Sequence, residues 1–412
     1  VRAHHAGRFH PHPDLLNSGE TNLDQARDRR DRHRVTQFDV LALLCSDART
    51  GLRTDVIVRA ATALTDWNGF LALVERHRVT GIAHTSAARC PEAFPPFIHD
   101  ALATEARTLA MRNVAIAAET VQLQRLFDEA AIDAVFFKGV ILAKRAYGSF
   151  LTKQSRDIDF LVPPADLSRI IALLERRGYR LERPWQNLTP AQWRSVQTFG
   201  MEIQMFHAGT QIAIEPHWRL VNNPKLLSSE VVRAAAKTES DEIAGNAIRT
   251  LHPDDLFAYL CVHGTACGWF RLKWLADLNA LIADASPEEI ERLYRHARSR
   301  GAGASAALAL SMCRTVFDRP VPASILARVD GLWSLRRLKA LCLGCLQVET
   351  VSRWRRFSVS VLQATAEGCL FTELNLWTIG DADAVKFPLP RPLHFLYRVI
   401  RIPSWLCRRL RG

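Results

Sequence analysis

The chain has 412 residues, of which 48% are hydrophobic and 23% are charged, as is typical of a globular protein with two or three domains. Basic residues outnumber acidic ones by 54 to 42, a net charge of +12, which favours anionic partners such as nucleotide, nucleic acid or phospholipid. The sequence contains no apolar run long enough for a transmembrane helix, and its nine scattered cysteines favour a reducing compartment. We therefore expect a cytoplasmic protein.

The N-terminal part of the chain divides into a polar segment and a helical region. Residues 1–37 are polar, mixed in charge and without apolar periodicity, which predicts disorder rather than a secretory signal or a metal site. From residue 38 to 126, apolar residues recur at spacings of three and four, which predicts helices. The segment "CPEAFPPF" interrupts this pattern with prolines, where we expect a break.

Residues 127–222 have a different pattern, which predicts a small α/β core. In chain order, "IDAVFFKG" predicts a strand, "VILAKRAYG" a short helix and "DIDFLV" a buried strand. A helix is expected next in "PPADLSRIIALLERRGY", beginning after the prolines and ending at Gly178. "MEIQMFH" and "QIAIEPHW" then predict a hairpin that turns at "AGT".

Residues 223–385 return to a helical pattern, in which Lys273 and Asp277 lie four residues apart and predict an ion pair on a helix surface. The last segment, 386–412, is aromatic and apolar, with seven basic residues and no acidic one. Two interpretations of this tail stay open. It lies against an anionic membrane surface, which makes the protein peripheral to the inner membrane, or it packs on the domain with its basic end in solvent.

The stretch "SRDIDFLV" places two carboxylates in front of an apolar run, so Asp157 and Asp159 point to one face of a strand. Such close carboxylates repel each other unless a proton or a cation lies between them, and carboxylate clusters hold Mg²⁺ or Mn²⁺ against triphosphate oxygens. Glu215 alternates with the apolar Ile212 and Ile214 and so points away from the core. If the hairpin pairs beside "DIDFLV", Glu215 becomes the third metal ligand or the base that activates the acceptor. A polar strand start and an exposed glutamate are the open alternatives.

Four further residues are candidates for contact with nucleotide phosphates. Lys138 and Gly139 end the first strand of the core and open a helix, where a backbone can approach a phosphate. Lys153 and Arg156, just before the aspartates, carry charge that can neutralise a triphosphate. A simple turn and solvated loop charges are the alternatives. His217 is a candidate for contact with the nucleotide or the acceptor, or else a buried, hydrogen-bonded histidine.

In this order the motifs resemble a nucleotidyltransferase-like family found in bacteria, often beside genes of peptide or polysaccharide biosynthesis. The residues that carry the resemblance are "FFKGVILAKRAYGSFLTKQSRDIDFLV", "IEPHWRL" and "HPDDLFAYLCVHGTACGWFRLKWLADLNALI", within about residues 65–400. The resemblance implies the fold of polymerase-beta-type nucleotidyltransferases. It also implies that Asp157 and Asp159 are Mg²⁺ ligands and that Lys138 and Gly139 lie on the nucleotide side.

Several positions depart from the family pattern. Glu215 replaces the usual aspartate, and Pro216 follows it, which predicts an edge strand because proline has no N–H to donate. Lys153 replaces the usual arginine and loses bidentate geometry. Val140 follows the motif glycine, where better-known nucleotidyltransferases have a small residue, so a hydroxyl contact to phosphate is absent.

We therefore predict an α+β fold, in which a small mixed sheet with helices, of nucleotidyltransferase type, lies between N- and C-terminal helical regions. The predicted activity is Mg²⁺-dependent (or Mn²⁺-dependent) transfer of a nucleoside monophosphate from an NTP to an unidentified acceptor. Protein, peptide, sugar or another small molecule can serve as acceptor, and nucleic acid is less favoured. One alternative is a catalytically degenerate binding or scaffold protein. The other is a D-x-D glycosyltransferase, in which the apolar strand normally precedes the aspartates rather than following them.

Overall fold

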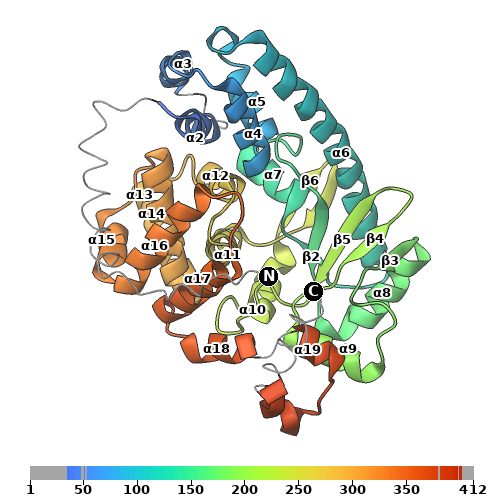
Figure 1. Cartoon of the computed structure of the whole chain (residues 1–412). Coiled ribbons are helices and arrows are strands. Elements are labelled where there is room, and N and C mark those ends of the chain that lie inside the picture. The colour runs from blue at the N-terminus through green and yellow to red at the C-terminus, as the bar shows by residue number, and fades with distance from the viewer. Residues whose placement is uncertain (1–34, 48–50, 52, 379–380, 398, 401–412) are drawn as a thin grey trace, which may run out of the picture.

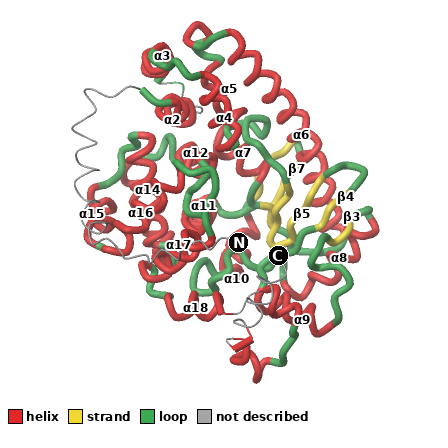
Figure 2. Tube along the Cα trace, in the orientation of Figure 1, coloured by secondary structure: helices red, strands yellow, loops and turns green. Residues whose placement is uncertain are grey.

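A computed structural model describes residues 35–47, 51, 53–378, 381–397 and 399–400. Nearly all of the segment 1–37 lies outside this range, and so do residues 401–412 of the basic tail. Figure 1 shows a small sheet on one side of the molecule and a large group of helices on the other. Figure 2 shows in the same view how few of the elements are strands.

The N-terminal region consists of helices, as its apolar periodicity predicts. These helices are α2 (Gln37–Asp47), α3 (Thr54–Thr62), α4 (Trp67–His77), α5 (Thr80–Ala87), the short η3 (Pro91–Ala93) and α6 (Pro96–Glu129). The prolines of "CPEAFPPF" separate α5 from α6, because proline favours the first turn of a helix and disrupts an interior. The long α6 runs from these helices to the sheet (Figure 1).

The core region holds a five-stranded mixed sheet with helices in its connections. Its elements are β1 (Val135–Phe136), α7 (Gly139–Tyr147), β2 (Asp157–Leu161), η4 (Pro164–Asp166), α8 (Leu167–Arg176), β3 (Tyr179–Leu181), α9 (Pro190–Phe199), β4 (Met205–His207) and β5 (Ile212–His217). The strand order is β1-β2-β5-β4-β3, and β2 and β5 run parallel while the other neighbours are antiparallel. The predicted α+β fold with a small mixed sheet is confirmed.

The edge position predicted for Pro216 is wrong, because β5 is the central strand of the sheet. Regular pairing with β4 ends at Ile214, opposite Met205. Beyond that point Ile203 donates its N–H to the Pro216 carbonyl at 3.2 Å. The N and the C=O of a strand residue point to the same side of the strand. The nitrogen of Pro216 therefore points to the irregular segment around Ile203, where regular pairing with β4 has ended. Its missing N–H removes no hydrogen bond of the regular sheet.

The C-terminal region is mostly helical but also contains a two-stranded sheet that the sequence analysis did not predict. This sheet pairs β6 (Ser240–Ile243) with β7 (Asn246–Arg249). The helices are α10 (Ser229–Ala235), η5 (Ala236–Thr238), α11 (Pro253–Ala266), α12 (Leu272–Leu281), α13 (Pro287–Ser299), α14 (Gly303–Phe317), α15 (Ala323–Gly331), α16 (Trp333–Leu346), α17 (Arg353–Ala366), α18 (Leu370–Thr378), α19 (Asp381–Lys386) and η6 (Arg391–Leu396).

Two large hydrophobic cores organise the chain. One lies under the sheet and joins Phe127 of α6 to Phe160 and Ile214 of the two central strands. The other joins the helices before the sheet to those after it, from Leu41 of α2 to Leu308 of α14. The helices that precede the sheet in the sequence and those that follow it therefore pack together into one helical body, which lies beside the sheet. None of the described helices is both long and apolar enough to cross a membrane.

Candidate active site

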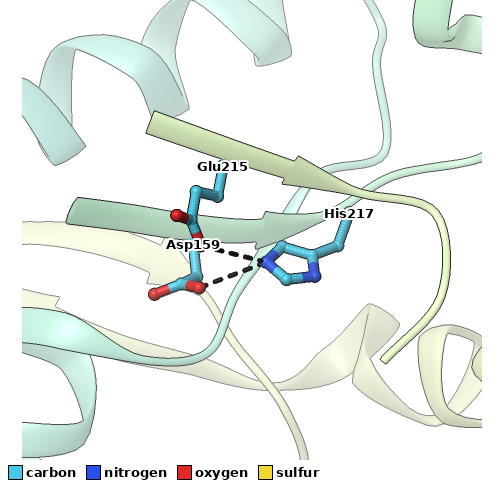
Figure 3. Close-up of side chains that lie close together, drawn as sticks. All are labelled: Asp159, Glu215 and His217. Atoms are coloured by element: carbon cyan, nitrogen blue, oxygen red, sulfur yellow. Dashed lines mark hydrogen bonds and ion pairs between the residues drawn. The ribbon is translucent and has the colours of Figure 1, made fainter. Parts of the chain in front are cut away.

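Two neighbouring strands bring the predicted carboxylates together. The β2–β5 pairing places Asp159 directly opposite Glu215, because Asp157 is in register with Ala213. Ile158, one position before Asp159, points into the core under the sheet, so the alternation of the strand turns both carboxylates to the other face. Figure 3 shows the Asp159 and Glu215 side chains side by side.

His217 completes this group from the end of β5. Ligand atoms of Asp159, Glu215 and His217 all lie within 4.8 Å of one another (Figure 3). His217 Nε2 is 3.1 Å from Asp159 Oδ1 and 3.9 Å from Glu215 Oε2. The ring is only 1% exposed and packs edge-to-face on Phe137. This sequence-predicted contact residue thus lies beside the carboxylates, two positions after Glu215 on β5, and holds Asp159 in place.

Lys138 is the direct counter-ion of the site. Its Nζ lies 2.9 Å from Asp159 Oδ1 and stands over the rings of Phe137 and Tyr259, 5.4 and 5.6 Å from their centroids. Burial alone would lower the pKa of Lys138, but the Asp159 carboxylate and Tyr259 raise it well above its usual value. Lys138 is therefore a permanent cation that binds one oxygen of Asp159.

Gly139 is required by the geometry of the turn after Lys138. It adopts φ +58°, a left-handed conformation that L side chains rarely adopt. A Cβ on Gly139 would lie 3.2 Å from the carbonyl oxygen of Asp157. The strand-to-helix turn predicted from "KG" therefore packs closely against the start of β2.

The carboxylates influence one another strongly. Burial alone would raise the pKa of Asp159, but Lys138 and then His217 outweigh it and hold that pKa below its usual range. Burial, followed by repulsion from the Asp159 carboxylate, raises the pKa of Asp157. Burial and then the charges of Asp159 and Asp157 raise the pKa of Glu215 to about 9. The carboxylates thus repel one another, and Lys138 forms an ion pair with only one of them, Asp159.

The donors fit a divalent metal ion. Carboxylate oxygens are the ligands that Mg²⁺ and Mn²⁺ prefer, and Asp159 and Glu215 offer theirs from adjacent strands. With its pKa raised to about 9 by burial and by the neighbouring carboxylates, Glu215 is protonated at neutral pH, so a bound metal would replace its proton. Asp157 lies outside the tight group of ligand atoms, although its charge contributes to the raised pKa of Glu215.

Sequence analysis missed two polar residues of this site, Glu202 and Gln204. Gln204 Nε2 donates a hydrogen bond to Glu215 Oε1 at 3.2 Å. Glu202 Oε2 lies 3.1 Å from His217 Nδ1, although the angle is not that of a hydrogen bond. The signal was present in "MEIQM", because Glu202 and Gln204 alternate with two buried residues, Ile203 and Met205.

The other two predicted phosphate contacts lie on the Asp157 side of the site. Lys153 is buried, and its Nζ is 3.5 Å from Asp277 Oδ2. The predicted surface ion pair between Lys273 and Asp277 is wrong, because Asp277 is only 1% exposed and pairs with Lys153 from another element. Arg156 is exposed at the start of β2.

An α+β fold whose mixed sheet carries paired carboxylates on adjacent strands defines the class of nucleotidyltransferase-type proteins. A family model described as an uncharacterised nucleotidyltransferase matches residues 63–318, more than half of the chain, and the chain therefore belongs to that family.

Comparisons with individual proteins add little to the family match. A solved structure of the antibiotic-resistance factor ANT(2'')-Ia aligns with 14% identity over 45% of this chain and 91% of that chain, at a TM-score of 0.31. A likeness of this size carries no argument about function. No curated protein matches the chain.

Proposed function

We propose that this protein is a metal-dependent nucleotidyltransferase that moves a nucleoside monophosphate from an NTP to an acceptor. The observation that carries the proposal is the register of β2 and β5, which sets Asp159 opposite Glu215 on the face away from the core. Family membership supports the same reaction class.

In the proposed reaction an acceptor oxygen forms a bond to the α-phosphorus of the NTP. The bond from that phosphorus to the bridging oxygen of pyrophosphate breaks, pyrophosphate leaves, and the proton of an acceptor hydroxyl passes to solvent. When bound, Mg²⁺ or Mn²⁺ supplies charge neutralisation for the phosphate oxygens and aligns them for attack. Asp159 and Glu215 would hold the metal, with Asp157 as the further carboxylate on the nucleotide side.

The surrounding residues of this chain position those carboxylates. His217 contacts Asp159 and fixes its position, and Gln204 orients Glu215 through its amide. Lys138 neutralises one oxygen of Asp159 and leaves the other oxygen for the metal. We assign His217 a positioning role rather than direct contact with the nucleotide, since its ring is buried.

The acceptor is proposed only by chemical class. The reaction needs a nucleophilic hydroxyl or phosphate, which a protein, a peptide, a sugar or another small molecule can supply. Incubation with α-labelled NTPs, Mg²⁺ and a cell extract identifies the acceptor by what becomes labelled. The proposal expects labelling that EDTA abolishes and that Asp159→Asn removes, and labelling that persists in both conditions would reject it.

A second candidate function is a nucleotide-binding or scaffold protein without transfer activity. The Lys138–Asp159 ion pair favours it, because an internal cation neutralises this carboxylate without a metal. Calorimetric titration with each NTP separates the two candidates. Binding that requires Mg²⁺ supports the transferase, and binding of equal strength in EDTA supports the scaffold.

A further inference from the structure

A second group of charged side chains lies beside Asp157, and its members are basic. We call it the basic cluster: Arg78 after α4, Lys153 and Arg156 in the loop before β2, and Arg271 and Lys273 at the start of α12. These residues come from three segments that are far apart in the sequence. No motif of the sequence links them.

Hydrogen bonds fix the end of α4 against the start of α12. The backbone N–H of Leu272 donates to His77 Nδ1 at 3.0 Å, and this histidine is fully buried. The guanidinium of Arg271 donates to the carbonyl oxygen of Arg76. The charged ends of the two helices therefore lie side by side, close to α7 in Figure 1.

Contacts with α5 and α6 fix the loop before β2. A Cβ on Gly81, at the start of α5, would lie 2.2 Å from the carbonyl oxygen of Thr152, so the two backbones touch. From α6, Asn113 Nδ2 donates to the carbonyl oxygens of Lys153 at 2.6 Å and Phe150 at 2.9 Å. The side chain of Asn113 is fully buried, and it holds the loop in one conformation.

The basic cluster lacks matching negative charge. Lys153 is paired with Asp277. Within the part of the chain that the structure describes, no carboxylate oxygen lies within 4.0 Å of a side-chain nitrogen of Arg78, Arg156, Arg271 or Lys273. Four basic side chains of the cluster thus have no carboxylate partner among the described residues.

Burial and then repulsion between the members lower the pKa values of two residues of the basic cluster. Burial, then Lys153, lowers the pKa of Lys273 to about 7. Burial, then Arg271 and Arg156, lowers the pKa of Arg78 to about 10, and only Asp157 opposes this shift. Folding therefore assembles positive charge that a bound anion would stabilise.

We propose that Arg78, Arg271 and Lys273 bind the β- and γ-phosphates of the NTP, so that helices α4 and α12 complete the phosphate site beside the sheet. The inference rests on the proposed function. It adds that residues from outside the sheet neutralise the pyrophosphate leaving group and that the protein selects triphosphates over monophosphates. Arginine suits this task because its planar fork makes two parallel hydrogen bonds to phosphate.

The test is calorimetric binding of inorganic tripolyphosphate in EDTA, with the full chain at physiological ionic strength. Arg78→Asn and Lys273→Gln each remove a charge that makes no hydrogen bond or ion pair within the described structure. Asparagine is chosen at position 78 because it tolerates the left-handed φ of 57° found there. Each variant should weaken tripolyphosphate binding about tenfold or more, the expected loss of one charge-assisted hydrogen bond.

A matched control separates the site from the general positive charge of the chain. Arg336→Gln removes one exposed charge from α16 and should leave tripolyphosphate affinity within about twofold of wild type. Equal affinity in wild type and in the two cluster variants, or equal weakening in the control, would overturn the inference.

A separate variant keeps the inference distinct from the proposed function. Asp159→Asn should retain metal-free tripolyphosphate binding while losing Mg²⁺-dependent NTP binding. If wild type binds tripolyphosphate through the basic cluster but never binds NTP in a metal-dependent way, the function fails and the anion site stands. If the cluster variants bind tripolyphosphate as tightly as wild type while metal-dependent NTP binding persists, the inference fails and the proposed function stands.

Discussion

The two sides of the candidate active site are built in different ways. The carboxylate side takes Asp159 and Glu215 from two adjacent strands, where alternation and register alone determine that they meet. The basic side takes its charges from two helix ends and a loop, and only packing between distant segments brings them together. The carboxylate side can therefore be predicted from the sequence, because strand geometry determines it. The basic side can be recognised only in the folded structure.

The two sides also differ in how their charge is balanced. Asp159 has its own counter-ion in the partly buried Lys138, whereas four members of the basic cluster have no carboxylate partner in the described structure. Unpaired basic side chains next to a group of carboxylates suit a ligand that brings both a cation and polyphosphate. An NTP with its metal has this composition.

Removing the Asp159 carboxylate should have the largest effect on the activity of the carboxylate side. Asp159→Asn keeps the shape but removes the charge that Lys138, His217 and the proposed metal share. We expect label transfer from an NTP to fall by about 10³-fold or more, since metal stabilisation of phosphate charge is worth several kcal/mol. Asp100→Asn, an exposed carboxylate on α6, is the control and should keep wild-type transfer. Near-normal transfer by Asp159→Asn would contradict the assignment.

Removing the Asp277 carboxylate should destabilise the basic side, because Asp277 is the ion-pair partner of Lys153. Asp277→Ala leaves Lys153 buried without its ion pair and Tyr147 without its hydrogen-bond acceptor at 3.0 Å. The free energy of unfolding should fall by about 3–5 kcal/mol, measured by denaturant titration. For comparison, Asp55→Ala breaks an exposed ion pair with Arg59 and should cost about 0.5 kcal/mol. Equal losses in the two variants would show that burial of Lys153 is unimportant.

The raised pKa of Glu215 predicts that metal binding depends on pH. With a pKa of about 9, Glu215 is protonated at neutral pH, and a metal must displace that proton. The metal association constant should therefore rise about tenfold per pH unit up to about pH 9 and then level off. Calorimetry in two buffers of different ionisation enthalpy counts the released proton. Glu215→Gln should remove both the proton release and this pH dependence, and an unchanged profile in that variant would assign the proton elsewhere.

Gly139→Ala should produce the smallest effect, on the turn that joins Lys138 to α7. A left-handed φ and a Cβ contact of 3.2 Å with the Asp157 carbonyl oxygen should together cost about 1–2 kcal/mol of unfolding free energy. Gly331→Ala is the matched control, because no atom lies within 4 Å of its Cβ position and its φ is ordinary. That control should be neutral or slightly stabilising in the same denaturant titration. If Gly139→Ala matches the control, the turn does not need glycine.

Much of the fold followed from local sequence patterns. The α/β core, its hairpin and the meeting of Asp159 with Glu215 were predictable because period-two alternation and short connections constrain them strongly. Pro216 was misplaced at an edge, because the sequence does not reveal that β4 ends its regular pairing before that residue.

The rest of the site depends on contacts between residues far apart in the sequence. Asp277 was expected on a helix surface with Lys273, since helix spacing says nothing about a partner such as Lys153 from another element. Arg78 and Arg271 carried no local signal, because their proximity arises from the packing of α4 against α12. Sequence patterns predicted strand residues well and tertiary neighbours poorly.

The most direct test of the central claim is the binding of Mn²⁺, followed by the loss of its free-ion electron paramagnetic resonance signal. The titration is carried out with wild type, Asp159→Asn and Glu215→Gln, each with and without NTP. The account predicts that wild type binds Mn²⁺ more tightly when NTP is present and that both variants lose most of this binding. Equal Mn²⁺ binding by all three proteins would contradict a metal site at Asp159 and Glu215.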